Sequence, residues 1–434
     1  MEIIVHRGTR EVGGTIIEVV SDGHRIILDV GMPLFDANRE PHDGQRLRKM
    51  AKDELVSEGI IPPVPGLFDD DNAPPDAILL SHAHLDHTGL LGHARNTIPV
   101  HASKGTSKMM LAGRLFASQV EIGRERFHEL WPGQPEQIGP FQVTAFPVDH
   151  SVFGCVSLLI EADGKSVLYS GDVRLHGRAA GQVDQLIEAV SDRRIDVLMM
   201  EGTHFGLPTE NDRSEDELQS DVCDIVRDTN GLVLASFSPQ HVDRLIAFMQ
   251  AASNAGRTFV ADIYTAFILH LVGSELDVPA PTAANNVRVY YPSHSVTSYK
   301  RRRLDRFFNQ FAKSRIELDE IRARPESHLM AFRPSMLSRD FAGELPRNST
   351  CIYSYWSGYL EKPDWLEVSA AIESSDSRLL PVHSTGHMLE DDIIRFACRI
   401  NARTVIPVHT FEPETFQKHL ANVTVLNDGQ RWPT

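Results

Sequence analysis

The chain has few cysteines, no long apolar segment and no excess of positive charge. Its 434 residues include four cysteines that lie far apart without a CxxC pair, which argues against a disulfide framework and a cysteine zinc cluster. No apolar run approaches the roughly 18 residues of a membrane-spanning helix. The formal net charge of −16 excludes a histone-like protein that binds nucleic acid through bulk positive charge. Because the N-terminus lacks a basic segment followed by an apolar one, we expect a cytoplasmic protein without membrane contact.

Histidine, in contrast, is abundant. The chain has 20 histidines, and several of them fall in short clusters at the ends of predicted strands. Hydrophobic residues make up 41% and charged residues 24% of the chain, which is typical of a folded globular protein. At this length we expect two or three domains and a large core.

The first 200 residues predict a β-rich unit. Short runs of β-branched and apolar residues alternate with turns, and the polar, proline-containing stretch 32–75 is expected to be mostly loop. The spacing of apolar residues predicts a helix over 106–130. The expected strands cover 3–6, 15–20, 25–30, 77–80, 141–148, 156–161, 166–169 and 196–200.

After Glu201 the pattern changes to alternating helices and strands. A capping box at 214–217 precedes a predicted helix over 218–230, and the alternation continues to residue 291. Such alternation predicts a parallel α/β layer, and the β-rich style returns at residue 378. We therefore expect an α/β protein in which one domain, residues 1–203 and 378–434, is interrupted by an inserted α/β domain, residues 204–377.

The segment His82-Ala-His84-Leu-Asp86-His87 carries the strongest functional signal. It follows the predicted strand 77–80, so two imidazoles two residues apart on a strand-end loop can bind one metal ion. The aspartate and histidine that come next are placed to bind a second ion. A surface cluster of histidines is the alternative, but this spacing after a strand is uncommon by chance.

Three further candidate ligands, His150, Asp172 and His409, also follow predicted strands. Each alone could be an ordinary core or surface residue. Together they complete two ligand sets with Asp172 as the bridge: His82, His84 and His150 for one ion, and Asp86, His87 and His409 for the other. Imidazole with carboxylate and no thiolate favours zinc, with manganese as the weaker alternative. We therefore predict two Zn²⁺ ions, with Mn²⁺ as the second choice.

These residues resemble the motifs of the metallo-β-lactamase fold. The resemblance rests on the cluster at 82–87, Asp29 in ILDVG, His150, Asp172 in SGD and the late His409, and it covers the first 203 and about the last fifty residues. It implies an αββα sandwich. Asp29 is then expected to support a ligand histidine, although a turn-capping role is the alternative.

Three more features narrow the resemblance to the β-CASP nucleases of this fold. Glu201 in MMEGTHFG resembles their motif A, His383-Ser-Thr-Gly-His387 their motif B, and His409 in PVH their motif C. The large insert between motifs A and B defines that group, so the inserted domain is expected to be a β-CASP domain. Motif by motif, the chain is similar to ribonuclease J and to the nuclease subunit of the cleavage and polyadenylation specificity factor.

The resemblance implies hydrolysis of phosphodiester bonds by a hydroxide that bridges the two ions. Four residues are expected to act in catalysis. Asp86 serves as a ligand, and His387 supplies a proton to the leaving 3′ oxygen. Glu201 orients His387 and keeps it protonated, and His383 contacts the scissile phosphate.

Two segments of the insert are candidates for substrate binding. SFSPQHVDRL predicts a strand, a turn and a helix N-terminus, where Ser236, Ser238 and His241 could hold a phosphate, unless this is an ordinary capped helix. Arg301 and Arg302 lie in the dense basic run at 300–315, predicted in part as a helix over 301–313. This run either follows a nucleic-acid backbone or is a solvated face. The aromatic residues at 353–356 could stack on bases or belong to a core strand.

We therefore predict a two-zinc ribonuclease, with endonuclease or 5′-exonuclease activity, that acts on single-stranded RNA in RNA processing or decay. A DNA nuclease of the same fold is the first alternative, although the family resemblance favours RNA because motif C carries His409. A small-molecule hydrolase for lactones or thioesters is the second, and a non-catalytic binding subunit the third. A homodimer is left open.

Overall fold

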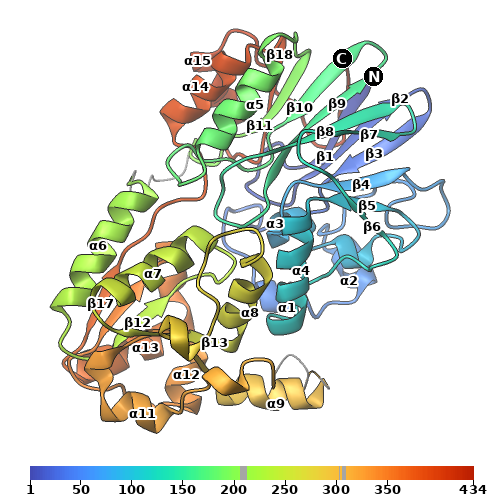
Figure 1. The fold of residues 1–434 in the computed structure, drawn as a ribbon. Helices are drawn as coiled ribbons and strands as arrows, with labels where there is room; N and C mark the ends of the chain where they lie inside the picture. The colour runs from blue at the N-terminus through green and yellow to red at the C-terminus, as the bar shows by residue number, and fades with distance from the viewer. Residues whose placement is uncertain (206–212, 303, 305–308) are drawn as a thin grey trace. The chain divides into compact units, whose positions relative to one another are not determined.

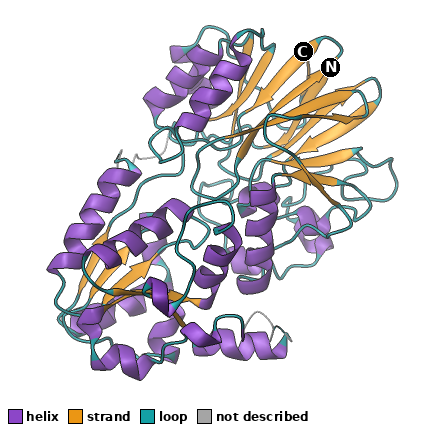
Figure 2. Ribbon diagram, in the orientation of Figure 1, coloured by secondary structure: helices purple, strands orange, loops and turns teal. Residues whose placement is uncertain are grey.

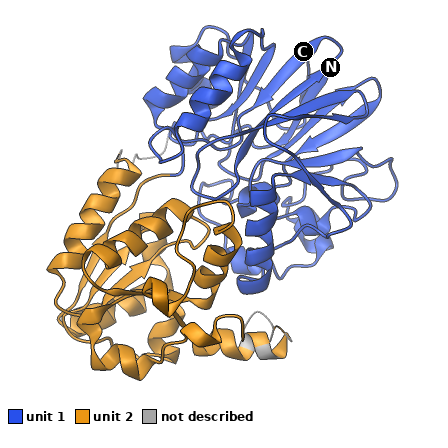
Figure 3. Ribbon diagram, viewed as in Figure 1, with its two compact units in different colours: residues 1–209, 386–434 blue, residues 210–385 orange. Residues whose placement is uncertain are grey.

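The computed structural model describes residues 1–205, 213–302, 304 and 309–434. The chain forms two compact units, residues 1–209 with 386–434 and residues 210–385 (Figure 3). One unit is therefore made from both ends of the chain, and the other is an insert. Figure 2 shows that both units combine strands with flanking helices.

The first unit contains two mixed sheets (Figure 1). The strands of the first sheet, in spatial order, are β19 (Arg431–Pro433), β1 (Glu2–Arg7), β2 (Ile16–Ser21), β3 (His24–Leu28), β4 (Ala77–Leu80), β5 (Val100–Ala102) and β6 (Phe127–Glu129). Those of the second are β18 (Thr404–Val408), β11 (Val197–Glu201), β10 (Lys165–Tyr169), β9 (Val156–Ala162), β8 (Phe141–Pro147) and β7 (Pro135–Ile138).

One apolar core joins the two sheets. Alternate residues of several strands enter it, such as Ile17 and Val19 from β2 and Val143 and Ala145 from β8, all of them buried. This period of two is what a strand with one face on a core requires. The helices of the unit are α1 (Gly44–Leu47), α2 (Lys52–Ser57), α3 (Leu85–Thr88), α4 (Lys104–Phe116), α5 (Gly181–Ser191), α14 (Glu390–Ile400) and α15 (Phe416–His419).

The second sheet of this unit is covered by α5 and α14, which contact β8 and β11 respectively. The αββα sandwich with an inserted α/β unit is thus confirmed. The predicted helix over 106–130 is wrong beyond Phe116, because Ser118 takes a left-handed backbone (φ 53°) and β6 follows. The expected loop 32–75 also contains the short helices α1 and α2.

The insert has one six-stranded sheet in which all strands are parallel. Its order is β14 (Val287–Tyr290), β13 (Thr258–Asp262), β15 (His328–Ala331), β12 (Val233–Ser236), β16 (Thr350–Tyr353) and β17 (Arg378–Pro381). Its helices are α6 (Glu215–Asp228), α7 (Val242–Asn254), α8 (Ile263–Val272), α9 (Ser293–Arg301), α11 (Leu318–Ala323), α12 (Pro334–Arg339) and α13 (Pro363–Ser374). The capping box of Ser214 and Glu217 begins α6 as predicted.

Short 3-10 helices complete both units. They cover Leu91–His93, Ala283–Asn285, Ala312–Ser314, Pro325–Ser327, Ser357–Glu361 and Pro413–Thr415. The basic helix expected over 301–313 differs from the structure, since α9 ends at Arg301 and a 3-10 turn begins at Ala312. Residues 303 and 305–308 of that prediction lie outside the described residues.

The units divide farther along the chain than the predicted boundaries at 203/204 and 377/378. β17 accounts for the second difference, because it pairs with β16 in the sheet of the insert. The division at 385/386 therefore falls inside the predicted motif B, with His383 in the insert and His387 in the other unit. Among the described residues, no helix has the length and apolar character needed to cross a membrane.

Candidate metal centre

The seven predicted metal ligands lie at the ends of strands in the first unit. β8, β10, β11 and β18 run in the same direction in the second sheet, so their carboxyl ends meet at one edge. His150, Asp172 and His409 follow β8, β10 and β18 at this edge. His82 and His84 follow β4, and the short helix α3 carries Asp86 and His87.

The structure brings all seven residues together. Their potential ligand atoms form overlapping groups in which all atoms of a group lie within 4.8 Å of one another. The groups are His82, His84, His150 and Asp172; Asp86, His87, Asp172 and His409; and Asp172, Glu201, His387 and His409. Asp172 is common to all three, which suits the bridging position that the sequence predicts for it.

Four buried atoms of this centre have no hydrogen-bond partner in the part of the chain that the structure describes: Nε2 of His82, Nε2 of His87 and both carboxylate oxygens of Asp172. The Nε2 atom of His87 is 3.2 Å from an Asp172 oxygen without forming a hydrogen bond. Buried polar atoms are nearly always hydrogen-bonded in proteins. Orphaned imidazole nitrogens that face an orphaned carboxylate therefore fit divalent metal ions as the missing partners.

The hydrogen bonds behind the ligands fix which nitrogen of each ring faces inward. Asp29 accepts hydrogen bonds from Nδ1 of His87 at 2.7 Å, from the Ser81 hydroxyl at 2.7 Å and from the Tyr169 hydroxyl at 2.7 Å. Because Ser81 donates to Asp29, its oxygen is left to accept from Nδ1 of His82, 3.0 Å away. The Nε2 atoms of both histidines consequently face the centre. Burial acts to lower the pKa of His87, but the carboxylates of Asp172, Asp29 and Asp86 outweigh it and raise the pKa, so a metal ion would replace a proton on this ring.

Thr203 plays the same part for His409, and the sequence analysis missed it. Its hydroxyl donates to Glu201 at 2.7 Å and therefore accepts from Nδ1 of His409 at 2.9 Å. The Nε2 atom of His409 then faces an Asp86 oxygen at 3.2 Å as a second acceptor. Two acceptors at this distance again fit a cation between them. The position of Thr203, two residues after Glu201 in motif A, was the available signal.

His150 is oriented by the backbone of motif B. Its Nδ1 atom donates to the carbonyl oxygen of Gly386, and its Nε2 atom lies 3.1 Å from Nδ1 of His84. A side chain at position 386 would lie 2.4 Å from the Ser151 hydroxyl oxygen and 3.0 Å from the His150 ring. Glycine at this position therefore permits the close approach of motif B to a ligand histidine.

Burial and neighbouring charges set the protonation of the site. Burial lowers the pKa of His82 and of His150 well below the usual value, so both imidazoles are neutral, as metal ligands must be. Burial also acts to lower the pKa of His387, but the carboxylates of Glu201 and Asp172 outweigh it and raise the pKa to about 9. Glu201 lies 3.0 Å from Nδ1 of His387.

One supporting residue, Asp29, and one predicted ligand, His409, adopt a strained backbone. Asp29 has a φ of 58° and His409 a φ of 52°, both in the left-handed region that residues other than glycine rarely occupy. In each case the unusual backbone turns the side chain toward the metal centre at the end of a strand. Such strain costs on the order of 1 kcal/mol per residue and clusters at functional sites.

The predicted substrate-binding residues of the insert do not form one surface. Ser236 ends β12 with a buried hydroxyl that has no partner, and Ser238 is half-buried in the turn that follows. His241 is the N-cap residue of α7, and its Nε2 atom lies 3.3 Å from Glu215. Helix α9, which follows β14, ends at Arg301, and Arg302 comes directly after it. Two strands, β13 and β15, lie between β14 and β12 in the sheet. The arginines therefore belong to another part of the insert.

His383 lies against a buried ion pair that the sequence analysis missed. Arg244 of α7 binds Glu215 of α6 through two hydrogen bonds, of 2.8 and 3.1 Å, and neither side chain is exposed. The same guanidinium donates to the Ser354 hydroxyl and to the Ser384 carbonyl oxygen. Burial, together with the charges of Arg244 and His241, lowers the pKa of His383 to about 3, so its ring is neutral.

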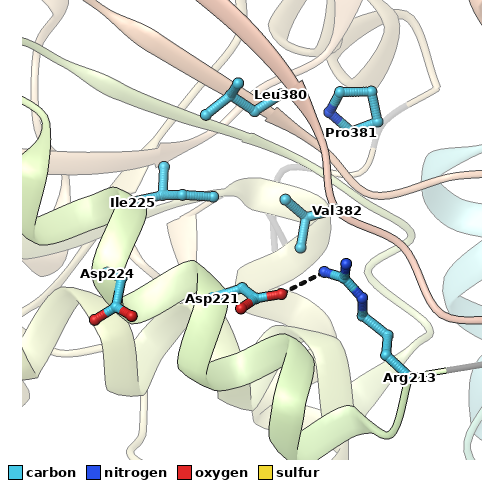
Figure 4. A pocket seen from close by; sticks show the side chains of 7 residues that line it. All are labelled: Arg213, Asp221, Asp224, Ile225, Leu380, Pro381 and Val382. Atoms are coloured by element: carbon cyan, nitrogen blue, oxygen red, sulfur yellow. Dashed lines mark hydrogen bonds and ion pairs between the residues drawn. The ribbon is translucent and has the colours of Figure 1, made fainter. Parts of the chain in front are cut away.

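Two further polar side chains, those of Arg174 and Tyr353, have structural roles. Arg174 is fully buried and donates to Asp149 at 2.7 Å, so it packs inside the unit. Tyr353 is also fully buried, and its hydroxyl donates to the Trp356 carbonyl oxygen, which places it in the core strand β16. A hollow of about 340 Å³ in the insert contains none of the predicted site residues. Its lining is Arg213, Asp221, Asp224, Ile225, Leu380, Pro381 and Val382 (Figure 4).

The sequence is similar to a known domain family and to several named proteins. Residues 56–210 match the model of the Beta-lactamase superfamily domain. Ribonuclease J of Mycolicibacterium smegmatis is 28% identical over 188 residues, which are 42% of this chain and 33% of that protein. Ribonuclease J of Sinorhizobium meliloti is 25% identical over 344 residues, 77% of this chain and 57% of that protein.

A third relative and a solved structure extend these matches. Ribonuclease J of Methanocaldococcus jannaschii is 25% identical over 306 residues, 68% of this chain and 66% of that protein. The chain thus spans between a third and two thirds of the length of these relatives. A protein of unknown function from Enterococcus faecalis V583 has the same fold over 99% of both chains, with a TM-score of 0.77 and 21% identity.

Proposed function

We propose that this chain, which has the metallo-β-lactamase fold with an inserted unit and resembles ribonuclease J, is a metal-dependent ribonuclease. One observation carries the proposal. Buried ligand atoms of His82, His87 and Asp172 face one another without a hydrogen bond among the described residues. This donor set suits a pair of zinc ions, with manganese as the alternative.

The ligands divide into two groups that share Asp172. His82, His84 and His150 would hold one ion, and Asp86, His87 and His409 the other. Ions bound in this way would supply a nucleophile from water at neutral pH and would neutralise the charge that develops on the phosphoryl oxygens. The chain itself orients the ligands, through Asp29 and Ser81 for two histidines and through Thr203 for His409.

His387 is the proposed proton donor to the leaving 3′ oxygen. Its raised pKa keeps it protonated at neutral pH, and Glu201 holds the ring through Nδ1, which assigns Nε2 as the donating atom. His383 is proposed to contact the scissile phosphate as a neutral hydrogen-bond donor. Arg244 positions it by binding Ser384 and Ser354 within the insert.

Single-stranded RNA is the proposed substrate. The matched relatives are named ribonuclease J, and His409 fills the position that resembles motif C of RNA-directed members. Ser236 and Ser238 are proposed to contact a phosphate of the strand. His241 is already bound to Glu215 and is better assigned to supporting the insert.

The test uses purified wild-type protein and His84→Ala with 5′-labelled single-stranded RNA and DNA, in the presence of zinc or manganese. We expect cleavage of RNA by the wild type and none by the variant. Faster cleavage of DNA would assign the chain to the alternative nuclease class. Hydrolysis of a lactone or thioester with both nucleic acids left intact would refute the proposal.

A further inference from the structure

A second group of histidines lies in the same unit but outside the metal centre. His101 is the middle residue of β5 and His128 the middle residue of β6, and the two are paired in register in adjacent parallel strands. Their side chains therefore stand on the same face of the sheet, and their rings stack with centroids 4.8 Å apart and planes inclined by 18°.

Glu136 approaches this histidine pair from the other sheet. It lies in β7, the edge strand of the second sheet, whereas β6 is the edge strand of the first. A loop of five residues, 130–134, connects the two strands, so the chain passes from one sheet edge to the other between His128 and Glu136. One oxygen of Glu136 lies 3.1 Å from Nδ1 of His101.

That nitrogen is not satisfied by the carboxylate. The His101 side chain is only 7% exposed, and its buried Nδ1 atom has an ion-pair contact with Glu136 but no hydrogen-bond partner among the described residues. A plain ion pair between His101 and Glu136 would align the N–H with the oxygen. It would also leave the stacked ring of His128 without a role.

The donor set is that of a transition-metal site. One ligand atom from each of the three residues can be chosen so that all lie within 4.8 Å of one another. Zinc–nitrogen and zinc–oxygen bonds of roughly 2.0–2.2 Å place neighbouring tetrahedral ligands about 3.3–3.6 Å apart. The pair of His101 and Glu136 is already close to this separation. The His128 side chain is exposed, so a small rotation about its side-chain bonds can bring a ring nitrogen to the same separation.

We propose that His101, His128 and Glu136 bind one zinc-like divalent ion in a site separate from the metal centre. Two imidazoles and one carboxylate leave the fourth position to water, as in other His₂Glu zinc sites. The ion would bond the edge strand of one sheet to the edge strand of the other. Its role is therefore to brace the open edge of the sandwich, where no neighbouring strand holds β6 or β7 on its outer side.

The test counts ions in protein that has been stripped with a chelator, reloaded with zinc alone and desalted. Wild type is expected to retain about three ions per chain by mass spectrometry of the metal, and His128→Gln and Glu136→Gln about two. Both substituted side chains are partly or fully exposed, so folding is expected to be preserved and is checked by circular dichroism. His24→Gln is the matched control, because His24 is an exposed histidine beside Asp76 in the same sheet and belongs to none of the ligand groups.

A second arm separates this site from the metal centre. In Asp172→Ala, zinc is expected to bind still at His101, and to raise the melting temperature by roughly 5 °C when it is present at 100 times its dissociation constant. Adding His128→Gln should remove the part of this shift that comes from zinc at His101, His128 and Glu136, while His24→Gln leaves the shift unchanged. An equal ion count in wild type and His128→Gln, or a wild-type count of two, would overturn the proposal whether or not the protein cleaves RNA.

Discussion

Both units bury charged and polar side chains, but they differ in whether these side chains have hydrogen-bond partners. In the insert, each nitrogen of the Arg244 guanidinium has a partner in Glu215, Ser354 or Ser384. In the first unit, the orphaned atoms of His82, His87 and Asp172 face one another without hydrogen bonds. Burial of charge therefore does not by itself indicate a ligand site. A ligand site is indicated by buried polar atoms that have no hydrogen-bond partner among the described residues.

Asp172→Ala is expected to have the largest effect on RNA cleavage, and it tests whether the buried atoms of the metal centre are held by a metal ion or by the fold. Because Asp172 is shared by all ligand groups of the metal centre, its loss should reduce RNA cleavage by at least about 10⁴-fold, or about 5 kcal/mol of transition-state stabilisation. Single-turnover cleavage of labelled RNA measures this loss. In metal-free buffer we expect the variant to be at least as resistant to urea as the wild type, since the removed carboxylate is buried without a hydrogen bond among the described residues and only neighbouring imidazoles offset its charge.

A lower unfolding free energy of metal-free Asp172→Ala would contradict this view of the site. It would mean that the aspartate is held by the fold itself, as the Glu215 carboxylate is in the insert.

The opposite outcome is expected for Arg244→Met in the insert. Removal of the arginine leaves the buried Glu215 carboxylate without its main counter-charge and with His241 beside it, which should cost about 3–5 kcal/mol of unfolding free energy, measured by urea denaturation. The double variant Glu215→Leu with Arg244→Met should recover most of this loss. Arg227→Met, which removes the exposed ion pair with Asp224, is the control and should cost at most about 1 kcal/mol. An equal loss of unfolding free energy in both arginine variants would mean that the buried ion pair matters no more for stability than the exposed one.

His387→Gln tests the proton donor and should slow cleavage by about 10²–10³-fold with metal content unchanged. Activity that needs the protonated ring is present at low pH and is lost as the pH rises through the pKa of His387. Burial acts to lower that pKa, but Glu201 and Asp172 raise it to about 9. Bound cations would lower it again, so we expect the alkaline limb of the pH–rate profile, where activity falls, at or below pH 9. Glu201→Gln should move the limb to lower pH. An alkaline limb that stays in place in this variant would exclude His387 as its origin.

The smallest of these effects is expected from Thr203→Val, which keeps the shape of the side chain but removes the acceptor for Nδ1 of His409. Loss of such an orienting hydrogen bond typically weakens metal binding by roughly 10–100-fold. Titration of metal-free protein with zinc measures this. Thr410→Val, a buried threonine beside His409 with no contact to its ring nitrogens among the described hydrogen bonds, is the control. Identical zinc affinity in both variants would refute the orienting role.

The sequence could predict the ligands because each follows a strand end in a compact motif. Parallel strands then bring those ends to one edge, as β10, β11 and β18 do for Asp172, Glu201 and His409. The sandwich and its inserted parallel sheet were also predictable, from the change between two kinds of hydrophobic pattern after Glu201.

The supporting contacts were not predictable, because they join residues far apart in the sequence through single hydrogen bonds. The Tyr169 hydroxyl on Asp29 and the Gly386 carbonyl on His150 leave no periodic pattern. The ion pair of Glu215 and Arg244 looks like ordinary helix surface in the sequence. The predicted helix over 106–130 failed because apolar spacing continues past Ser118, where a left-handed backbone ends it.

The left-handed backbone of Asp29 and His409 has a consequence for protein engineering. Selection for heat resistance in metal-free medium would reward glycine or asparagine at His409, since either relaxes the backbone, and asparagine at Asp29, where it also keeps an acceptor for the buried Ser81 and Tyr169 hydroxyls. It would equally reward an apolar residue in place of Asp172. A thermostabilised descendant of this chain could therefore keep the sandwich and lose every trace of its chemistry, unless the divalent ion is supplied throughout the selection.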